Sequence, residues 1–294
     1  MYVELVRTVT RDGLRLDGAL SAPSDANSAG GNSRAASAAI LLHGVAGNFY
    51  TSSTFEPLIP KLQEIGVTAL SVNTRGRDSV FGAGLGTVRR RFGAAYEIVD
   101  DCRQDIAAWI DFLKNRGHQR IALIGHSLGA IKAVYFQAHE KNTAITAVVA
   151  TSPPRLSYSA FMNAPESAQF CDSLHIAEEL VKAGKSEELF TSKFPFPLLI
   201  TAAAYIDKYG PAERYNILKF AAGLPCPALF TYGSKELDSG GIAFAGMRDA
   251  LGSLPNGERR TVKVIDGADH VYTGVAVRLA QEIATWLTSA QVKS

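Results

Sequence analysis

Polar and hydrophobic residues alternate near the start of the chain, and short apolar runs replace this alternation further on. Residues 2–20 contain two alternating stretches, separated by the turn-forming pair Asp12-Gly13. Strict alternation is typical of strands with one exposed face, so the segment predicts an antiparallel hairpin at a sheet edge. Residues 21–37 are rich in Ser, Ala, Asn and Gly, which predicts an exposed loop.

Beyond this loop, short apolar runs indicate strands that are buried on both faces. These runs are residues 38–42, 67–72, 120–124, 145–150, 227–232 and 261–265. Helical patterns lie at 55–65, 96–116 and 274–290, and a further helix opens near Ser127. Alternating strands and helices predict βαβ crossovers and an α/β fold, with helices on both faces of a mostly parallel sheet.

The alternation is interrupted after Pro153-Pro154, which follow the apolar run at 145–150. Residues 173–190 and 205–222 have a helical pattern, and no obvious buried strand precedes Pro195 in this part of the chain. An insertion into the sheet domain explains such an interruption. The predicted division is an α/β core of residues 1–154 and 223–294, and an inserted helical segment of residues 155–222.

Composition narrows the possible classes of function. The chain has 294 residues, 47% hydrophobic and 20% charged, and is long enough to bury a core without a metal or disulfide. A net charge of +2 is too small for a broad nucleic-acid-binding surface. The run Arg89-Arg90-Arg91 is the one dense basic cluster. It predicts a solvated loop or helix end, with an anionic-substrate or partner site as the alternative.

The spacing of the cysteines and the pattern of the first residues indicate in which cellular compartment the protein is expected. Cys102, Cys171 and Cys226 are widely spaced and include no Cys-x-x-Cys pair, so no metal site, redox motif or cofactor is expected. Free thiols favour a reducing compartment. The first residues lack a secretory-signal pattern, and no apolar stretch approaches the roughly 20 residues of a membrane span. We expect a cytoplasmic protein with no membrane segment, and the pattern gives no oligomeric state.

A G-x-S-x-G motif, Gly125-His126-Ser127-Leu128-Gly129, lies between an apolar strand and a helix. A serine hydroxyl becomes nucleophilic when a base takes its proton, and a sharp turn presents it to base and substrate. The two glycines let strand and helix approach closely because they lack a Cβ. The N–H of Leu128, at the helix N-terminus, is placed to bind an oxyanion. The motif therefore predicts Ser127 as a nucleophile, and a helix-capping serine is the simpler alternative.

His43-Gly44-Val45 directly follows the first buried strand. A loop at this place can supply the second oxyanion N–H, and Val45 is the candidate donor. We expect His43 to orient the loop through hydrogen bonds. The alternative is an ordinary glycine-containing turn at a strand end.

The candidate base and acid lie on loops after the last two strands. His270 precedes the final helix, where a loop can reach the sheet edge that carries Ser127. A carboxylate must hold its imidazole, and two follow the preceding strand: Glu236 first and Asp238 as the alternative acid. The chain order of serine, acid and histidine is the one this kind of sheet requires.

Together these features resemble the α/β-hydrolase superfamily. The resemblance rests on HGVAGN at 43–48, NTRGRD at 73–78, GHSLGA at 125–130, YGSKE at 232–236 and GADH at 267–270. It implies an eight-stranded, mostly parallel sheet with a helical cap, at residues 155–222. Asn73 departs from the aspartate that many members carry there, and Glu236 from the usual aspartate acid. Serine at position 127 argues against relatives with an aspartate nucleophile, such as epoxide hydrolases and haloalkane dehalogenases.

The predicted activity is hydrolysis of a carboxylic ester or related acyl substrate through an acyl-enzyme. C–C bond, thioester or lactone hydrolysis and acyl transfer remain alternatives on the same triad, and a non-catalytic binding protein is the alternative from another class. The expected partner is a small molecule with an apolar or aromatic portion, not nucleic acid. Candidate pocket residues in the cap are Tyr158, Phe161, Met162, Phe170, Phe194, Phe196 and Tyr205.

Overall fold

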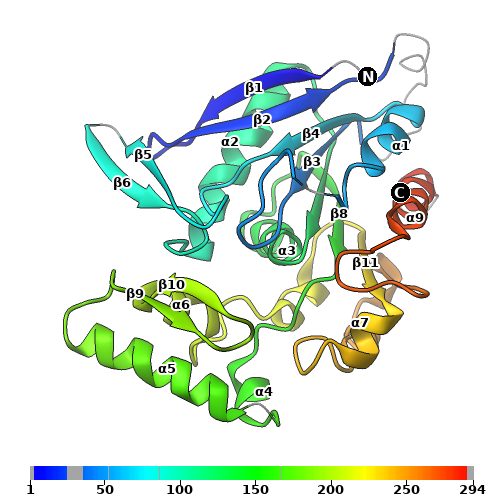
Figure 1. Ribbon diagram of the computed structural model, residues 1–294. Coiled ribbons are helices and arrows are strands. Elements are labelled where there is room, and N and C mark those ends of the chain that lie inside the picture. The colour runs from blue at the N-terminus through cyan, green and yellow to red at the C-terminus, as the bar shows by residue number, and fades with distance from the viewer. Residues whose placement is uncertain (1–2, 25–35, 52, 86, 166, 290–294) are drawn as a thin grey trace.

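Eight strands form one mostly parallel sheet at the centre of the molecule (Figure 1). The computed structural model describes residues 3–24, 36–51, 53–85, 87–165 and 167–289. In spatial order the strands are β1 (Glu4–Val9), β2 (Arg15–Ser21), β4 (Thr68–Val72), β3 (Ala38–Leu42), β7 (Ile121–His126), β8 (Ile145–Thr151), β11 (Ala228–Gly233) and β12 (Arg260–Ile265). The β1–β2 and β2–β4 pairs are antiparallel, and the remaining pairs are parallel. The predicted sheet is confirmed, with the expected hairpin at its edge.

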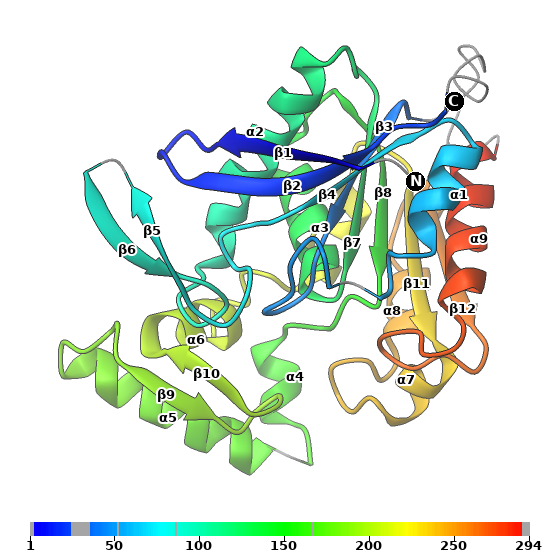
Figure 2. The same cartoon turned by 45° about the horizontal axis from the view of Figure 1, so that its top comes forward.

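Helices cover both faces of this sheet, as the alternation of strands and helices predicted. The flanking helices are α1 (Leu58–Glu64), α2 (Cys102–Asn115), α3 (Leu128–Glu140) and α9 (Ala276–Thr288). α1 packs against α9, and Figure 2 shows the two side by side. Because successive strand residues point to opposite faces, Ile40 and Leu42 join the cluster with α2 and α3, whereas Leu41 joins the cluster with α1 and α9.

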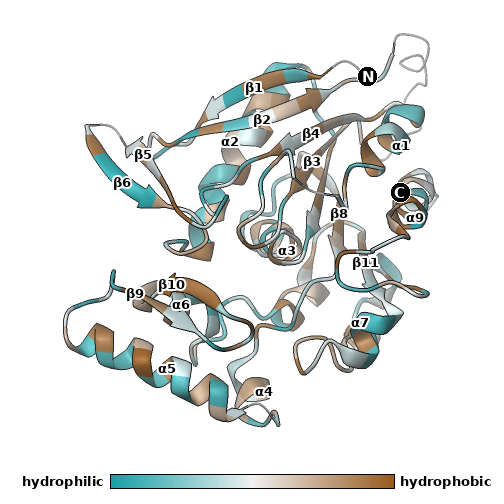
Figure 3. Cartoon of the chain, viewed as in Figure 1, coloured by the Kyte–Doolittle hydropathy of each residue, from teal (hydrophilic) through white to brown (hydrophobic). Residues whose placement is uncertain are grey.

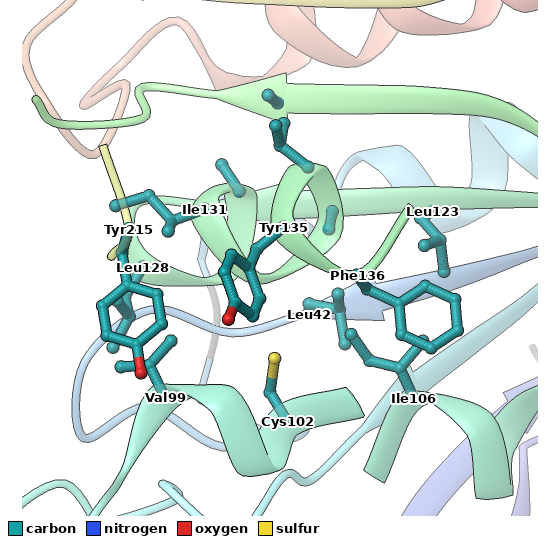
Figure 4. Close-up of a cluster of buried hydrophobic side chains, with 14 of the residues drawn as sticks. Leu42, Val99, Cys102, Ile106, Leu123, Leu128, Ile131, Tyr135, Phe136 and Tyr215 are labelled. Atoms are coloured by element: carbon teal, nitrogen blue, oxygen red, sulfur yellow. The ribbon is translucent and has the colours of Figure 1, made fainter. Parts of the chain in front are cut away.

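The core beneath α3 fixes the position of the helix that follows Ser127. Figure 4 shows Cys102 and Ile106 of α2 facing Ile131, Tyr135 and Phe136 of α3. All five side chains are at most 5% exposed. Burying a large apolar side chain contributes about 1.5–3 kcal/mol, so this contact holds α3 firmly against the sheet.

A two-stranded hairpin that the sequence did not predict projects from the sheet domain. It consists of β5 (Phe81–Leu85) and β6 (Val88–Phe92). The basic run at 89–91 lies in β6, so the expected loop or helix end is corrected to an exposed strand. Figure 3 shows β6 as hydrophilic, in contrast to the hydrophobic central strands. A strand without a buried apolar face leaves no periodic signal in the sequence.

The inserted segment is not purely helical. It contains α4 (Tyr158–Met162), α5 (Ser167–Lys182), β9 (Leu189–Ser192), β10 (Leu198–Thr201), α6 (Ala202–Tyr209), η3 (Ile217–Lys219) and η4 (Ala221–Gly223). β9 and β10 form an antiparallel pair, so the expectation of a purely helical insertion is corrected. β9, the strand before Pro195, is mostly part-exposed, in keeping with the absence of an obvious buried strand there. Figure 1 shows α4, α5, α6 and the β9–β10 pair as a layer beneath the sheet domain. The domain boundaries at 155 and 222 stay a prediction.

Two helices of this segment end earlier than predicted. The helix expected over 173–190 is α5, which stops at Lys182 because the backbone turns left-handed at Gly184, with φ 73°. The helix expected over 205–222 is α6, which stops at Tyr209. Pro211 follows closely and has no N–H to continue a helical ladder.

Element boundaries in the core also differ slightly from expectation. The helix predicted over 96–116 starts at Cys102, after the short turn η2 (Val99–Asp101). The helices predicted at 55–65 and 274–290 are the shorter α1 and α9. The remaining short elements are α7 (Ser234–Ser239), α8 (Met247–Gly252) and η5 (Gly257–Arg259). Most of the loop predicted for 21–37 lies outside the described residues.

Candidate active site

Ser127 lies at the sharp turn between β7 and α3. Its backbone has φ 55° and ψ −120°, a strained conformation for a residue with a side chain. The turn is this tight because glycines line it: a Cβ on Gly125 would lie 2.1 Å from the carbonyl oxygen of Gly129. A Cβ on Gly129 would lie 2.2 Å from the carbonyl oxygen of Leu42. The strained turn leaves the Ser127 hydroxyl partly exposed at the end of the strand.

The structure brings the predicted serine, histidine and first-choice acid together. His270 Nε2 lies 3.0 Å from Ser127 Oγ, within hydrogen-bonding distance. The other ring nitrogen, Nδ1, lies 2.5 Å from Glu236 Oε1. A proton on Nδ1 that is donated to this carboxylate leaves Nε2 free to accept the serine proton. The constellation has the geometry of a serine nucleophile with an oriented base.

The alternative acid does not reach His270. Glu236 is in the first turn of α7, and its side chain is 1% exposed. Its Oε2 accepts the backbone N–H of Gly233 at 3.1 Å, which caps the helix. Asp238 lies on the same helix but faces solvent. Asp269, next to His270, instead accepts backbone N–H groups of its own turn.

Ser152 is a buried residue of the site that the sequence reasoning missed. It directly follows β8, has φ 50° and donates its hydroxyl to Glu236 Oε2 at 2.7 Å. Tyr272 OH lies 3.0 Å from the same hydroxyl and 2.8 Å from Thr231 Oγ1. The only sequence signal is a serine after a buried strand, which is too common to single out. Ser152 leaves Glu236 Oε1 available to His270 because it binds the other oxygen.

His126 holds the His270 loop through a hydrogen bond to its backbone. Its Nε2 donates to the backbone carbonyl of His270 at 2.7 Å, and the two rings lie 5.0 Å apart. Burial, and secondarily the nearby charge of His270, lowers the pKa of His126 to about 4. His126 is therefore neutral near pH 7 and adds no charge beside the base.

The His43-Gly44-Val45 turn packs directly against Ser127. A Cβ on Gly44 would lie 3.2 Å from Ser127 Cβ, and Val45 lines the same cavity as Ser127. His43 contacts this turn and the loop after β4: its Nδ1 lies 2.8 Å from the Gly44 carbonyl oxygen, and its Nε2 accepts the N–H of Thr74 at 3.1 Å. Leu128 is the first residue of α3, so its N–H has no partner within the helix. Of the two candidate oxyanion donors, Leu128 follows Ser127 directly in the chain, and Val45 belongs to a separate turn that lines the same cavity.

A cavity of about 400 Å³ opens at Ser127. Its lining includes the polar residues Asn48 and Thr51. An apolar part of the lining comes from the inserted segment: Leu198, the first residue of β10, and Phe196, which precedes this strand. The cavity therefore offers both hydrogen-bonding and apolar contacts to a small molecule.

Most of the expected pocket residues instead form the interior of the inserted segment. Phe161, Phe170 and Phe194 contact one another through edge-on ring packing, and each is at most 5% exposed. Tyr205 is fully buried and donates its hydroxyl to the carbonyl of Phe194. Tyr158 packs on Phe170, and Met162 is 40% exposed. Of the seven residues predicted, Phe196 alone is among the described lining of the cavity at Ser127.

Neither a metal-binding cluster nor a membrane-spanning helix is found among the described residues. Among the described residues, no group of three or more His, Cys, Asp or Glu side chains is arranged to hold a metal ion. No helix in the described part of the chain has the length and apolar character needed to cross a membrane. Cys102, Cys171 and Cys226 are all free thiols.

Comparison with protein families decides the classification. A model of the alpha/beta hydrolase family matches residues 39–282, which include the turn at Ser127, the His270 loop and the strands of the sheet other than the β1–β2 hairpin and the first residue of β3. The chain belongs to the alpha/beta hydrolase family. This match confirms the resemblance noted from the motifs. A search of curated proteins finds no significant match.

Solved structures of several hydrolases share this fold over nearly their whole length. Est1E of Butyrivibrio proteoclasticus with bound ferulic acid superposes with a TM-score of 0.64 at 16% identity, covering 96% of this chain and 98% of that one. The esterase domain of a Rhodothermus marinus protein gives 0.59 at 16% identity, covering 98% of each chain. A Paleococcus ferrophilus monoacylglycerol lipase gives 0.61 at 16% identity, covering 98% and 99%. At these identities the similarity establishes the shared fold.

Proposed function

We propose that this alpha/beta hydrolase is a serine hydrolase that cleaves a carboxylic ester through an acyl-enzyme. The observation that carries the proposal is the alignment of Ser127 Oγ, His270 and Glu236, with successive contacts of 3.0 and 2.5 Å. A non-catalytic binding protein has no need for a serine in a strained turn beside an oriented imidazole. The fold shared with esterases and a lipase supports the same reaction class.

In the proposed mechanism, His270 takes the proton of Ser127 as Oγ attacks the ester carbonyl carbon. The N–H groups of Val45 and Leu128 stabilise the resulting oxyanion. His270 then returns the proton to the leaving alcohol, and Glu236 stabilises the imidazolium while it exists. Water attacks the acyl-enzyme by the same route and releases the acid. The side chain of His270 is 38% exposed, which gives water access to the base.

The cavity supports a small ester with one apolar part as substrate. Phe196 and Leu198 offer an apolar surface, and Thr51 and Asn48 are polar residues of the lining. Est1E, which shares the fold, has been solved with ferulic acid bound, an aromatic acid. We propose a substrate whose apolar acyl or aromatic group rests on Phe196. The cytoplasmic location and the role of 155–222 as a cap remain predictions.

The test is labelling of the folded protein with a fluorophosphonate probe, followed by peptide mass spectrometry and hydrolysis of p-nitrophenyl esters. We expect modification at Ser127 that disappears in Ser127→Ala, with ester hydrolysis lost in parallel. Adding an alcohol acceptor separates hydrolysis from acyl transfer by the products formed. Folded wild-type protein that neither reacts with the probe nor hydrolyses any ester would contradict the proposal.

A further inference from the structure

A buried lysine is connected to the turn that carries the Val45 N–H. Lys132 lies on α3 and is fully buried, and its Nζ donates to Thr74 Oγ1 at 3.1 Å. Thr74 Oγ1 lies 3.1 Å from His43 Nε2. His43 Nδ1 in turn lies 2.8 Å from the carbonyl oxygen of Gly44. Three side chains thus form a continuous hydrogen-bonded path from an ammonium group to this turn.

The donors and acceptors give this path a single direction. His43 Nε2 accepts the backbone N–H of Thr74 at 3.1 Å, so this nitrogen carries no proton. Burial, and secondarily the charge of Lys132, lowers the pKa of His43 to about 4, and the ring is neutral with its proton on Nδ1. Lys132 therefore donates to Thr74, Thr74 to His43, and His43 to the Gly44 carbonyl. Hydrogen bonds aligned in this way strengthen one another in a low-dielectric interior.

The last bond of the path acts on the candidate oxyanion donor. The Gly44 carbonyl and the Val45 N–H belong to one planar trans peptide group, in which they point in opposite directions. The bond to His43, together with the N–H of Gly47 that donates to the same carbonyl at 3.2 Å, therefore fixes the direction of the Val45 N–H. An oxyanion donor is effective when its direction is set before the reaction begins.

Glu97 supplies the opposite charge that a buried ammonium group requires. Its Oε1 lies 2.5 Å from Lys132 Nζ, and both side chains are fully buried. Its Oε2 lies 3.9 Å from Nζ of Lys208, which is equally buried on α6 of the inserted segment. A Cβ on Gly76 would lie 1.9 Å from Glu97 Oε1, so the carboxylate packs directly on this backbone. Burial raises the pKa of Glu97, but the two ammonium charges outweigh it and lower the pKa overall.

We propose that Lys132 is a positioning residue for the oxyanion turn, acting through Thr74 and His43 with Glu97 as its counter-ion. The inference rests on the proposed function, because it concerns the oxyanion of the same reaction. Lys132 itself contacts no reacting atom in this scheme. Its effect is expected in the transition state, where the oxyanion has formed, rather than in substrate binding.

The sharpest test changes the middle of the path and leaves the buried charges in place. Thr74→Val removes the hydroxyl at nearly constant volume, and Thr74→Ser retains it. For a p-nitrophenyl ester we expect Thr74→Val to lower kcat by about 10- to 100-fold with KM changed less than about threefold, somewhat less than loss of an oxyanion donor itself. Thr74→Ser should recover most of kcat. Equal kcat values for Thr74→Val and wild type would overturn the inference, as would equal losses in both variants.

A second set of variants tests the head of the path. Lys132→Met removes this ammonium group and leaves Glu97 beside Lys208, so the carboxylate is not left buried alone. We expect it to lower kcat as Thr74→Val does, while Lys208→Met, which removes the other ammonium beside Glu97, changes kcat less than about threefold. Wild-type kcat in Lys132→Met would reject the role of Lys132. Ser127→Ala measured alongside separates the two proposals, since full activity there would reject the serine mechanism itself.

Discussion

Ser152 binds Glu236 Oε2 at 2.7 Å, on the carboxylate oxygen opposite the one that His270 contacts. The hydroxyl follows β8 and the carboxylate follows β11, so two neighbouring strands of the sheet determine the contact. A carboxylate held on both oxygens has one orientation available. The imidazole of His270 is therefore held by a group that is itself fixed.

Replacing Ser152 by alanine tests this arrangement. Removing a donor from a buried carboxylate costs about 1.5–3 kcal/mol, so Ser152→Ala should lower the unfolding free energy by about that amount. We also expect kcat to fall by about tenfold because Glu236 Oε2 then keeps only the N–H of Gly233, and the carboxylate is held less firmly. Denaturant unfolding and steady-state kinetics provide the two measurements. Ser239→Ala on the exposed part of α7 is the matched control, and equal behaviour of the two variants would argue against the role of Ser152.

The two carboxylates of α7 should respond very differently to neutralisation. Glu236→Gln keeps the shape of the side chain but cannot stabilise the imidazolium, and kcat should fall by about 10³- to 10⁴-fold. Asp238→Asn should leave kcat within about twofold, because Asp238 faces solvent. Kinetics of the two variants at one pH decide the assignment. A large loss in Asp238→Asn with little loss in Glu236→Gln would reverse it.

Stability should fall in mildly acidic solution because of two buried histidines. Burial lowers the pKa of both His43 and His126 to about 4 from the usual 6.5. Between these values the unfolded chain binds protons that the folded chain does not, so stability decreases as pH falls from about 6.5 to 4. Each imidazole contributes up to about 3 kcal/mol over this range.

Urea unfolding between pH 7 and 4.5 measures this effect. His126→Gln, which keeps a donor toward the His270 carbonyl, should flatten the profile relative to wild type. His139→Gln is the control, since His139 is a partly exposed histidine on α3. A wild-type profile that is flat from pH 7 to 4.5 would show that the two imidazoles titrate normally.

Phe196 should determine selectivity among esters. It is the aromatic residue of the inserted segment that lines the cavity at Ser127. Phe196→Ala should lower kcat/KM for an aromatic ester by about tenfold, equivalent to about 1.4 kcal/mol, and change it little for an acetate ester. Met162→Ala, at a predicted pocket residue that the structure places elsewhere, should affect neither substrate. Equal losses for the aromatic ester in both variants would exclude a specific role for Phe196.

The sequence predicted the parts of this protein that depend on local patterns. The apolar runs at 38–42 and 145–150 are strands because burial on both faces requires apolar residues throughout. The turn at Ser127 was predictable because strand, glycines and helix are contiguous. The hairpins β5–β6 and β9–β10 were missed because they lack a strong apolar period.

Contacts between residues far apart in the sequence could not be predicted from the hydrophobic pattern. The contacts of Ser152 with Glu236 and of Lys132 with Glu97 depend on how the strands and helices pack in three dimensions. The aromatic residues of the inserted segment show the same limit: Phe161 and Phe196 look alike in sequence. One is buried among other rings and the other faces the cavity. The choice between Glu236 and Asp238 likewise depended on which side of α7 meets His270.

Glu236 contacts both His270 and the backbone of its own helix, and this double role affects which mutations the protein can tolerate. In many enzymes a catalytic group is a burden on stability, and its removal makes the protein more robust. Here the carboxylate that holds His270 also caps its own helix through the N–H of Gly233. Mutations that remove this carboxylate from the proposed triad should therefore also weaken the fold. Selection for protein stability and selection for catalytic turnover therefore favour the same side chain. We expect that loss of Glu236 rarely gives a protein that is inactive but still stable.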